Sequence, residues 1–293
     1  MTDTMEKIGL IIFSIFFLGD LNAQKNETVT LTSEQFKQIK AKATELYREL
    51  DRVTPGEEGA PPSDAFVLFD GSSLDPWQKP FFEYSGSMAE YAERLPALKR
   101  GPYNTRPADW QLEKGEMVAV PGAGHLVTKE LFGDVQLHIE WLAPENTTKK
   151  GQDYSNSGIF FMGLYEVQIL NSYDNETYNN GQAGAIYKQH IPLVNATKPP
   201  GNWQRYDIVF STPKFSERGD LLNPARMTVF HNGVLIQNNV SLLGPTCYIG
   251  QSHYMKHPEE LPILLQDHGN PVRFRNICLL YTISEPTRRR GIS

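Results

Sequence analysis

The feature that most constrains the fold is a series of short β-type runs that alternate with turn-rich segments from residue 66 onward. Apart from residues 78–109, which interrupt the series, no helical period intervenes between these runs. Asn232-Gly233 is a typical hairpin turn because both residues readily take positive φ. Short strands separated by Gly and Pro clusters are typical of a jelly-roll β-sandwich, so we expect an all-β domain. The ten predicted strands are residues 66–69, 115–120, 135–141, 158–162, 165–170, 203–210, 225–230, 233–236, 262–265 and 272–283.

The composition agrees with a globular domain and argues against several classes of protein. The chain has 293 residues, of which 40% are hydrophobic, and this is enough to build a core without a disulfide scaffold. It carries 28 Lys and Arg against 34 Asp and Glu, for a net charge of −6. Nucleic-acid binders usually present a basic surface, so we expect no nucleic-acid partner.

The N-terminus has the order of a secretory signal peptide. Residues 8–18 are apolar apart from Ser14, and Lys7 precedes them. This run is far shorter than the roughly 20 residues that a membrane-spanning helix needs, so we expect no membrane span. We therefore interpret residues 1–23 as a signal peptide and the protein as exported, either periplasmic or extracellular. The alternative is a buried N-terminal helix.

Residues 24–63 are predicted to form a helix followed by a linker. Apolar residues recur near the helical period over 32–53, with Ser33 or Thr32 as the cap, and 54–63 is rich in Pro and Gly. The sandwich is predicted to cover residues 64–283. Within it, 78–109 is interpreted as an insertion or long loop, with a helix near 87–98. We expect residues 284–293 to form a flexible tail.

Alternation along two predicted strands places carboxylates on polar strand faces. Glu166 and Gln168 alternate with Tyr165, Val167 and Ile169, and Glu140 lies opposite the face of its own apolar neighbours. If the two strands are neighbours in a concave sheet, the paired carboxylates suit sugar binding or acid–base chemistry. The alternative is a solvated outer face, which alternates in the same way.

A second candidate group surrounds the Gln266-Asp267-His268-Gly269 sequence. His268, Asp267 and Arg275 together offer an acid, a base and an anion clamp. The alternative is a turn that Asp267 and Gly269 fix, with Arg275 as an ion-pair partner. Both interpretations remain open at this point.

Metal and thiol chemistry are weakly indicated. His253 and His257 are four residues apart, and 172–177 is acidic, but neither fits a zinc or calcium motif well, so a divalent cation stays an open alternative. Cys247 and Cys278 are equally compatible with a disulfide and with two free thiols. The chain lacks the G-x-S-x-G, H-E-x-x-H, P-loop and G-x-G-x-x-G motifs, so the enzyme classes that depend on them have no support.

Seven long segments follow one another between residues 64 and 283. They are LFDGSSLDPW (68–77), TKELFGDVQLHIEW (128–141), NSGIFFMGLYEVQIL (156–170), GQAGAIYKQHIPLVNA (181–196), PPGNWQRYDIVF (199–210), ARMTVFHNGVLIQ (225–237) and PILLQDHGNPVRFRNI (262–277). In these segments and their order the chain resembles the 3-keto-disaccharide hydrolase family, also called domain of unknown function 1080. Two departures are a long 78–109 segment and Met162, where many members carry Arg or Gln.

This resemblance implies a concanavalin A-like fold and the hydrolysis of glycosides whose sugar carries a ketone at C3. Such a ketone acidifies the C2 hydrogen, so a base can remove that proton and the enolate can expel the C1 substituent. Water then adds back. The path needs a base, a group that stabilises the enolate and an acid for the leaving oxygen.

By position, the family motifs imply a set of site residues in this chain. Glu166 is expected as the base or a cation ligand, Glu140 as a second carboxylate and His268 as a proton donor. Gln168 and Asn156 are expected to bind sugar hydroxyls, with Lys129 or Arg275 supplying positive charge near the enolate. The alternative function is a non-catalytic carbohydrate-binding module, for which stacked aromatic rings and neutral hydrogen-bonding groups are typical.

Overall fold

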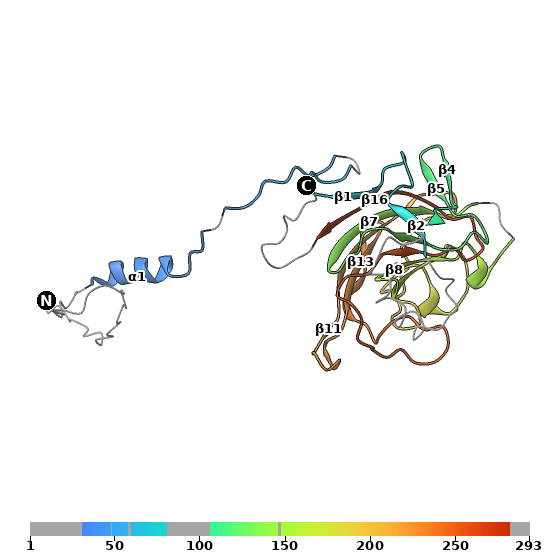
Figure 1. The fold of residues 1–293 in the computed structure, drawn as a ribbon. Helices are drawn as coiled ribbons and strands as arrows, with labels where there is room; N and C mark the ends of the chain where they lie inside the picture. The colour runs from blue at the N-terminus through green and yellow to red at the C-terminus, as the bar shows by residue number, and fades with distance from the viewer. Residues whose placement is uncertain (1–30, 48, 58–59, 81–105, 146–147, 282–293) are drawn as a thin grey trace. The chain divides into compact units, whose positions relative to one another are not determined.

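The computed structural model describes residues 31–47, 49–57, 60–80, 106–145 and 148–281 (Figure 1). The chain divides into two units, Met1–Arg52 and Val53–Ser293, which are described separately below. The predicted signal peptide, the helix near 87–98 and the C-terminal tail lie outside the described residues. Within those residues, no helix combines the length and the apolar character needed to cross a bilayer.

The first unit contains one helix, α1 (Ser33–Lys42), which is much shorter than the predicted 32–53. Thr32 caps it through a capping box, with its hydroxyl accepting from the Gln35 N–H at 3.2 Å. None of its residues is buried, so it lacks the packing that stabilises most protein helices. The Thr44 hydroxyl donates to the Ala41 carbonyl just beyond its end. The apolar period therefore predicted the helix correctly but not its length.

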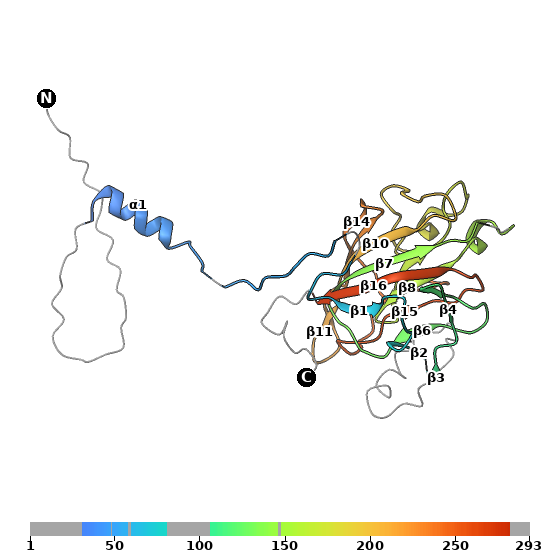
Figure 2. The same ribbon diagram turned by 90° about the horizontal axis from the view of Figure 1, so that it is seen from above.

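The second unit is an antiparallel β-sandwich, as predicted (Figures 1 and 2). The larger sheet has eight strands, in the order β14 (Val234–Ser241), β13 (Arg226–His231), β10 (Gln204–Ser211), β7 (Val135–Leu142), β16 (Arg273–Tyr281), β5 (Glu116–Val118) and β4 (Gln111–Glu113), with β1 (Phe66–Phe69) also paired to β16. The smaller sheet has six, in the order β3 (Arg106–Pro107), β2 (Trp77–Lys79), β6 (Leu126–Thr128), β15 (Leu264–Leu265), β8 (Ser157–Phe161) and β9 (Tyr165–Ile169). A two-stranded ribbon joins β11 (Lys214–Phe215) to β12 (Leu221–Asn223).

All ten predicted runs contain a strand, and among the described residues six short strands outside these runs were missed. Strands β2, β3, β4, β6, β11 and β12 have only two or three residues each. Two residues cannot display a period of two, so hydrophobic alternation gives no signal for them. Strands β2 and β3 pair with each other near the two ends of the predicted insertion, 78–109, so its ends are strands of the smaller sheet.

The core lies between the two sheets and is rich in aromatic side chains. Strands β7 and β10 alternate buried and more exposed residues, as expected for a sheet with one face on the core. Phe161 of β8 packs on Phe210 of β10 with ring centroids 4.9 Å apart. The Tyr206 hydroxyl crosses the core and donates to the Gln168 carbonyl of β9 at 3.0 Å. These contacts join the smaller sheet firmly to the larger one.

Strands β8 and β9 are five residues long, and every residue in them is buried, on both faces. Loops that include the 3₁₀ turns Gly151–Asp153 and Asn179–Gly181 contact this part of the smaller sheet. The alternation in β9 predicted its two faces correctly. Its polar face, however, is neither a solvated surface nor an open one.

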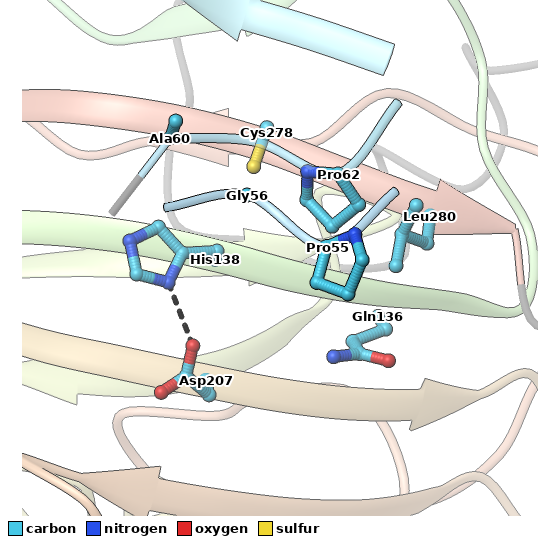
Figure 3. A pocket seen from close by; sticks show the side chains of 9 residues that line it. All are labelled: Pro55, Gly56, Ala60, Pro62, Gln136, His138, Asp207, Cys278 and Leu280. Atoms are coloured by element: carbon cyan, nitrogen blue, oxygen red, sulfur yellow. Dashed lines mark hydrogen bonds and ion pairs between the residues drawn. The ribbon is translucent and has the colours of Figure 1, made fainter. Parts of the chain in front are cut away.

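The segment predicted as a linker, 54–63, forms a loop whose two ends are hydrogen-bonded to each other. The Thr54 N–H donates to the Ser63 hydroxyl, and the Ser63 N–H donates to the Thr54 carbonyl, both at 3.0 Å. Between this segment and the outer face of the larger sheet is a pocket of about 290 Å³ (Figure 3). Its lining residues are Pro55, Gly56, Ala60, Pro62, Gln136, His138, Asp207, Cys278 and Leu280.

The structure answers the open question about the cysteines, because Cys247 and Cys278 are both free. Cys278 is buried below the 54–63 segment, and burial, followed by the charge of Asp207, raises the pKa of its thiol. Cys247 is more accessible. We therefore expect Ellman's reagent to modify Cys247 quickly and Cys278 slowly in the native protein, because only the thiolate reacts.

Unfolding in denaturant without a reductant should expose both thiols to the reagent at one common rate. Fewer than two titratable thiols in the unfolded, unreduced protein would show a disulfide and contradict this assignment. A Cys278→Ser variant assigns the slow phase.

Candidate functional site

The candidate site lies around Glu166 on β9, on the face of the smaller sheet that points away from the core. Register pairs Phe160 of β8 with Glu166 on one side. On the other side Ile186 pairs with Val167, and the Tyr187 N–H bonds the Glu166 carbonyl, so Tyr187 lies opposite Glu166. Directly opposed side chains in a sheet have Cβ atoms about 5 Å apart. The Glu166 side chain therefore has an aromatic residue on each side.

A glycine makes room for the Glu166 carboxyl group. Gly158 of β8 pairs with Gln168, one step along the face. A side-chain carbon at position 158 would lie 2.6 Å from a Glu166 carboxyl oxygen and 2.8 Å from the Phe160 ring. The carboxyl group thus occupies the space that any other residue would fill at position 158.

Burial without a charged partner shifts the protonation of Glu166. The residue is 4% exposed, and within the described ranges no residue hydrogen bonds or ion-pairs with its carboxyl oxygens. Burial raises the pKa of Glu166 to about 8, because an ionised carboxyl is costly in a poorly solvated place. A carboxyl group with such a pKa exchanges a proton near neutral pH, as an acid or base catalyst must.

Three amide side chains are linked by hydrogen bonds that begin at Gln168, which shares its strand face with Glu166. The Gln168 amide group donates to the Asn156 oxygen at 3.4 Å and to the Gln152 oxygen at 3.5 Å, both at the long limit for hydrogen bonds. The Asn156 amide group donates to the Gln152 carbonyl at 2.7 Å. Structure therefore brings the two predicted sugar-binding residues, Gln168 and Asn156, to the side of Glu166. No sequence pattern selects Gln152, which lies in a short 3₁₀ turn.

The expected pairing of Glu166 with Glu140 is wrong. Glu140 lies on β7, in the other sheet, with its side chain on the outer face of the larger sheet. There it accepts from Arg275 Nε at 2.6 Å and from the Asn276 amide at 3.1 Å. Alternation along a strand shows which residues share a face, but it does not show which sheet a strand joins. Strands β7 and β9 alternate alike and belong to different layers.

Arg275 lies with Glu140 on the outer face of the larger sheet, so it is not beside Glu166. Its guanidinium carbon lies 4.0 Å from the centroid of the Trp203 ring, in addition to the ion pair with Glu140. Nearby, His138 bonds Asp207 at 2.7 Å, and Arg205 pairs with Asp207 at 3.1 Å. This is the ion-pair alternative for Arg275, with β16 tied to β7.

His268 and Lys129 are not brought into contact with Glu166. The His268 ring is exposed and bonds no other described residue. Asp267 fixes its turn by accepting backbone N–H groups of Gly122, Gly124 and Gly269 at 2.8–3.0 Å. Lys129 is exposed and follows β6, three strands from β9 and thus about 14 Å away across the sheet.

The residues considered for metal binding serve other roles. His257, buried, bonds the Tyr165 hydroxyl at 2.7 Å, so it is part of the core and not paired with His253 on a metal. Asn175 ties the 172–177 loop to the Gly151 N–H at 2.7 Å. Across the described ranges, no group of three or more His, Cys, Asp or Glu side chains is placed to hold a metal ion.

Comparisons with known proteins agree with this fold. A family model for the 3-keto-alpha-glucoside-1,2-lyase-like domain matches residues 64–280. A crystal structure described as a candidate glycosyl hydrolase from Parabacteroides distasonis is 38% identical, with 87% of this chain and 99% of that chain covered and a TM-score of 0.70. A second one from the same organism is 15% identical, with 73% and 92% covered and a TM-score of 0.47. No curated protein matches the chain.

The raised pKa of Glu166 predicts a pH dependence of stability. Between about pH 4.5 and 8 the folded protein keeps a proton that the unfolded chain releases, so the folded state loses stability as pH rises through this window. We expect the free energy of unfolding to fall by a few kcal/mol in the wild type and not in Glu166→Gln. Urea denaturation of both proteins at several pH values measures this difference, and an equal fall in both would contradict it.

Arg275→Ala is expected to reduce stability by about 1–2 kcal/mol, through loss of the partly exposed ion pair and the contact with Trp203. Because Arg275 and Glu166 lie in different layers, the two effects should add. Thermal unfolding at two pH values therefore should show a lower Tm with the Glu166-dependent pH effect unchanged. A change in that pH effect would place Arg275 in the Glu166 site.

Proposed function

Since the chain belongs to the 3-keto-alpha-glucoside-1,2-lyase-like family, we propose that it cleaves glycosides whose sugar carries a ketone at C3. Removal of the C2 proton begins the reaction, and Glu166 is the base. The finding that carries this proposal is the buried Glu166 carboxyl, whose pKa of about 8 lies close to a working pH.

The C3 ketone explains why a carboxylate suffices as the base. The electron pair of the C2–H bond moves toward C3, and the ketone oxygen becomes an enolate oxygen, so the proton that Glu166 accepts is much more acidic than an ordinary sugar C–H. The enolate then reforms the ketone and expels the oxygen on C1. The products are the free aglycone alcohol and a sugar with a double bond between C1 and C2.

The neighbouring amides suit the charge that develops in this step. The Gln168 amide makes only long hydrogen bonds to Asn156 and Gln152, so its N–H groups can turn to an enolate oxygen or a sugar hydroxyl at little cost. Strand β9 holds Glu166 and Gln168 on one face, two residues apart, which fixes the donor relative to the base. Addition of water to C1 and of a proton to C2 would complete a hydrolysis.

Export is part of the same proposal. The apolar run at residues 8–18, with Lys7 before it, supports a signal peptide and a periplasmic or extracellular site of action. A substrate made by an oxidising enzyme in that compartment would fit this location.

The test compares cleavage of a 3-keto-glucoside with that of the same glucoside before oxidation, followed by release of the aglycone. The wild type should cleave only the keto form. Its kcat/KM should rise with pH and be half-maximal near pH 8, because the base acts only when ionised. Glu166→Gln should lose about 10²–10⁴-fold in kcat/KM. Glu130→Gln, at an exposed position, is the matched control and should retain wild-type activity.

Full activity of a folded Glu166→Gln variant would contradict the assignment of the base. Binding of either sugar by calorimetry with no cleavage of either would instead favour a non-catalytic carbohydrate-binding module. Loss of cleavage on addition of EDTA would add a divalent cation to the site.

A further inference from the structure

Two hydrogen-bonded tyrosines, Tyr187 and Tyr178, begin at the position opposite Glu166. Tyr187 lies opposite Glu166 on the same face, as the antiparallel bridge between Val167 and Ile186 requires. Its hydroxyl is hydrogen-bonded to the Tyr178 hydroxyl at 2.8 Å. Tyr187 is half-buried and Tyr178 is 38% exposed, so the two phenols lead from the buried carboxyl towards solvent.

The Tyr178 ring packs closely against Gly181, and the Gln152 amide group lies next to the same glycine. A side-chain carbon at position 181 would overlap the Tyr178 ring and lie 2.9 Å from the Gln152 amide nitrogen, so the ring and the amide meet above this glycine. The Gln152 oxygen in turn accepts from Gln168. Gln152 and Tyr178 thus both lie next to Gly181, with Gln152 bonded to Gln168 and Tyr178 bonded to Tyr187.

A lysine places positive charge beside both rings. Lys188 Nζ lies 4.0 Å from the centroid of the Tyr178 ring and 5.8 Å from that of the Tyr187 ring. Such a cation favours a negative charge on a nearby phenol oxygen. Burial, then the hydrogen bond with Tyr178, raises the pKa of Tyr187, so the phenol holds its proton at neutral pH. Tyr187 therefore holds a proton at neutral pH that it can donate to a more basic oxygen.

We propose that Tyr187 is the acid that protonates the leaving aglycone oxygen, with Tyr178 as the group that returns a proton to it. This inference rests on the proposed function, and it assigns to Tyr187 the role for which the sequence had suggested His268. The C2 hydrogen and the C1 oxygen are on adjacent carbons, so the base and the acid must lie side by side. Cross-strand neighbours such as Glu166 and Tyr187 meet that requirement, whereas the His268 ring is exposed and makes no contact with Glu166.

The proton and electron balance of the step is simple. Glu166 takes the C2 proton, the C1–O bond breaks, and its electron pair stays on the aglycone oxygen. That oxygen takes the phenol proton of Tyr187, which leaves a phenolate. The Tyr178 hydroxyl passes its own proton to this phenolate across the 2.8 Å hydrogen bond and is reprotonated by water.

An acid that protonates the leaving oxygen increases the rate only when that oxygen is basic. The experiment therefore compares leaving groups of different basicity. Two 3-keto-glucosides are compared, one with a sugar as the leaving group and one with 4-nitrophenol. With the sugar, Tyr187→Phe should lose about 10²–10⁴-fold in kcat/KM. With 4-nitrophenol, whose anion leaves unprotonated, the loss should be less than about tenfold. Tyr178→Phe should show a smaller loss with the same dependence on the leaving group.

The matched control is Tyr173→Phe, another partly exposed tyrosine on a nearby loop, which should match the wild type with both substrates. An equal loss with both leaving groups in Tyr187→Phe would overturn the acid role and show a binding or structural one, and so would no loss at all. Wild-type cleavage of both keto substrates is the reference. If the wild type cleaves neither, the proposed function itself fails and this inference falls with it.

Discussion

Everything at the candidate site depends on a carboxyl group buried without a charged partner. Glu166 lies between Phe160 and Tyr187, and its oxygens occupy the space above Gly158. The resulting rise in pKa, from about 4.5 to about 8, corresponds to a free-energy cost of a few kcal/mol for ionising this group. Strongly shifted pKa values cluster at functional sites, which is why we propose Glu166 as the proton acceptor.

The two outer faces of the sandwich carry different kinds of polar side chain, and within the described residues only one face leaves a carboxyl group without a charged partner. On the larger sheet, the charges are paired with one another, as Glu140 with Arg275 and His138 with Asp207. On the smaller sheet, β8 and β9 are covered on both faces, and the polar groups beside Glu166 are neutral amides and phenols. Lys188 lies over the phenol rings on this face but forms no ion pair with Glu166, so burial alone sets the raised pKa of this carboxyl.

Much of the fold was predictable from the sequence, whereas the site was predictable only in part. Alternation in β9 correctly set Glu166 and Gln168 on one face. It did not reveal that β7 joins the other sheet, because strands in either layer show the same period, and so Glu140 was wrongly placed beside Glu166. Tyr178 and Gln152 reach the site from 3₁₀ turns, where no period marks a functional residue.

The family match over residues 64–280 added the class of substrate behind the proposed function, which the alternation of residues does not indicate. It did not decide the roles of individual residues. The structure distinguishes Arg275, which forms an ion pair on the larger sheet, from Gln168, which lies two residues from Glu166 on the same strand face.

The most direct test of the account follows the C2 proton itself. A 3-keto-glucoside is incubated with the protein in heavy water, and deuterium at C2 of the released sugar and of the remaining substrate is followed by NMR. We expect deuterium at C2 with the wild type, at a rate that rises with pH and is half-maximal near pH 8. With Glu166→Gln we expect none above the spontaneous rate. Cleavage of the glycoside with the C2 hydrogen fully retained in the product would contradict it.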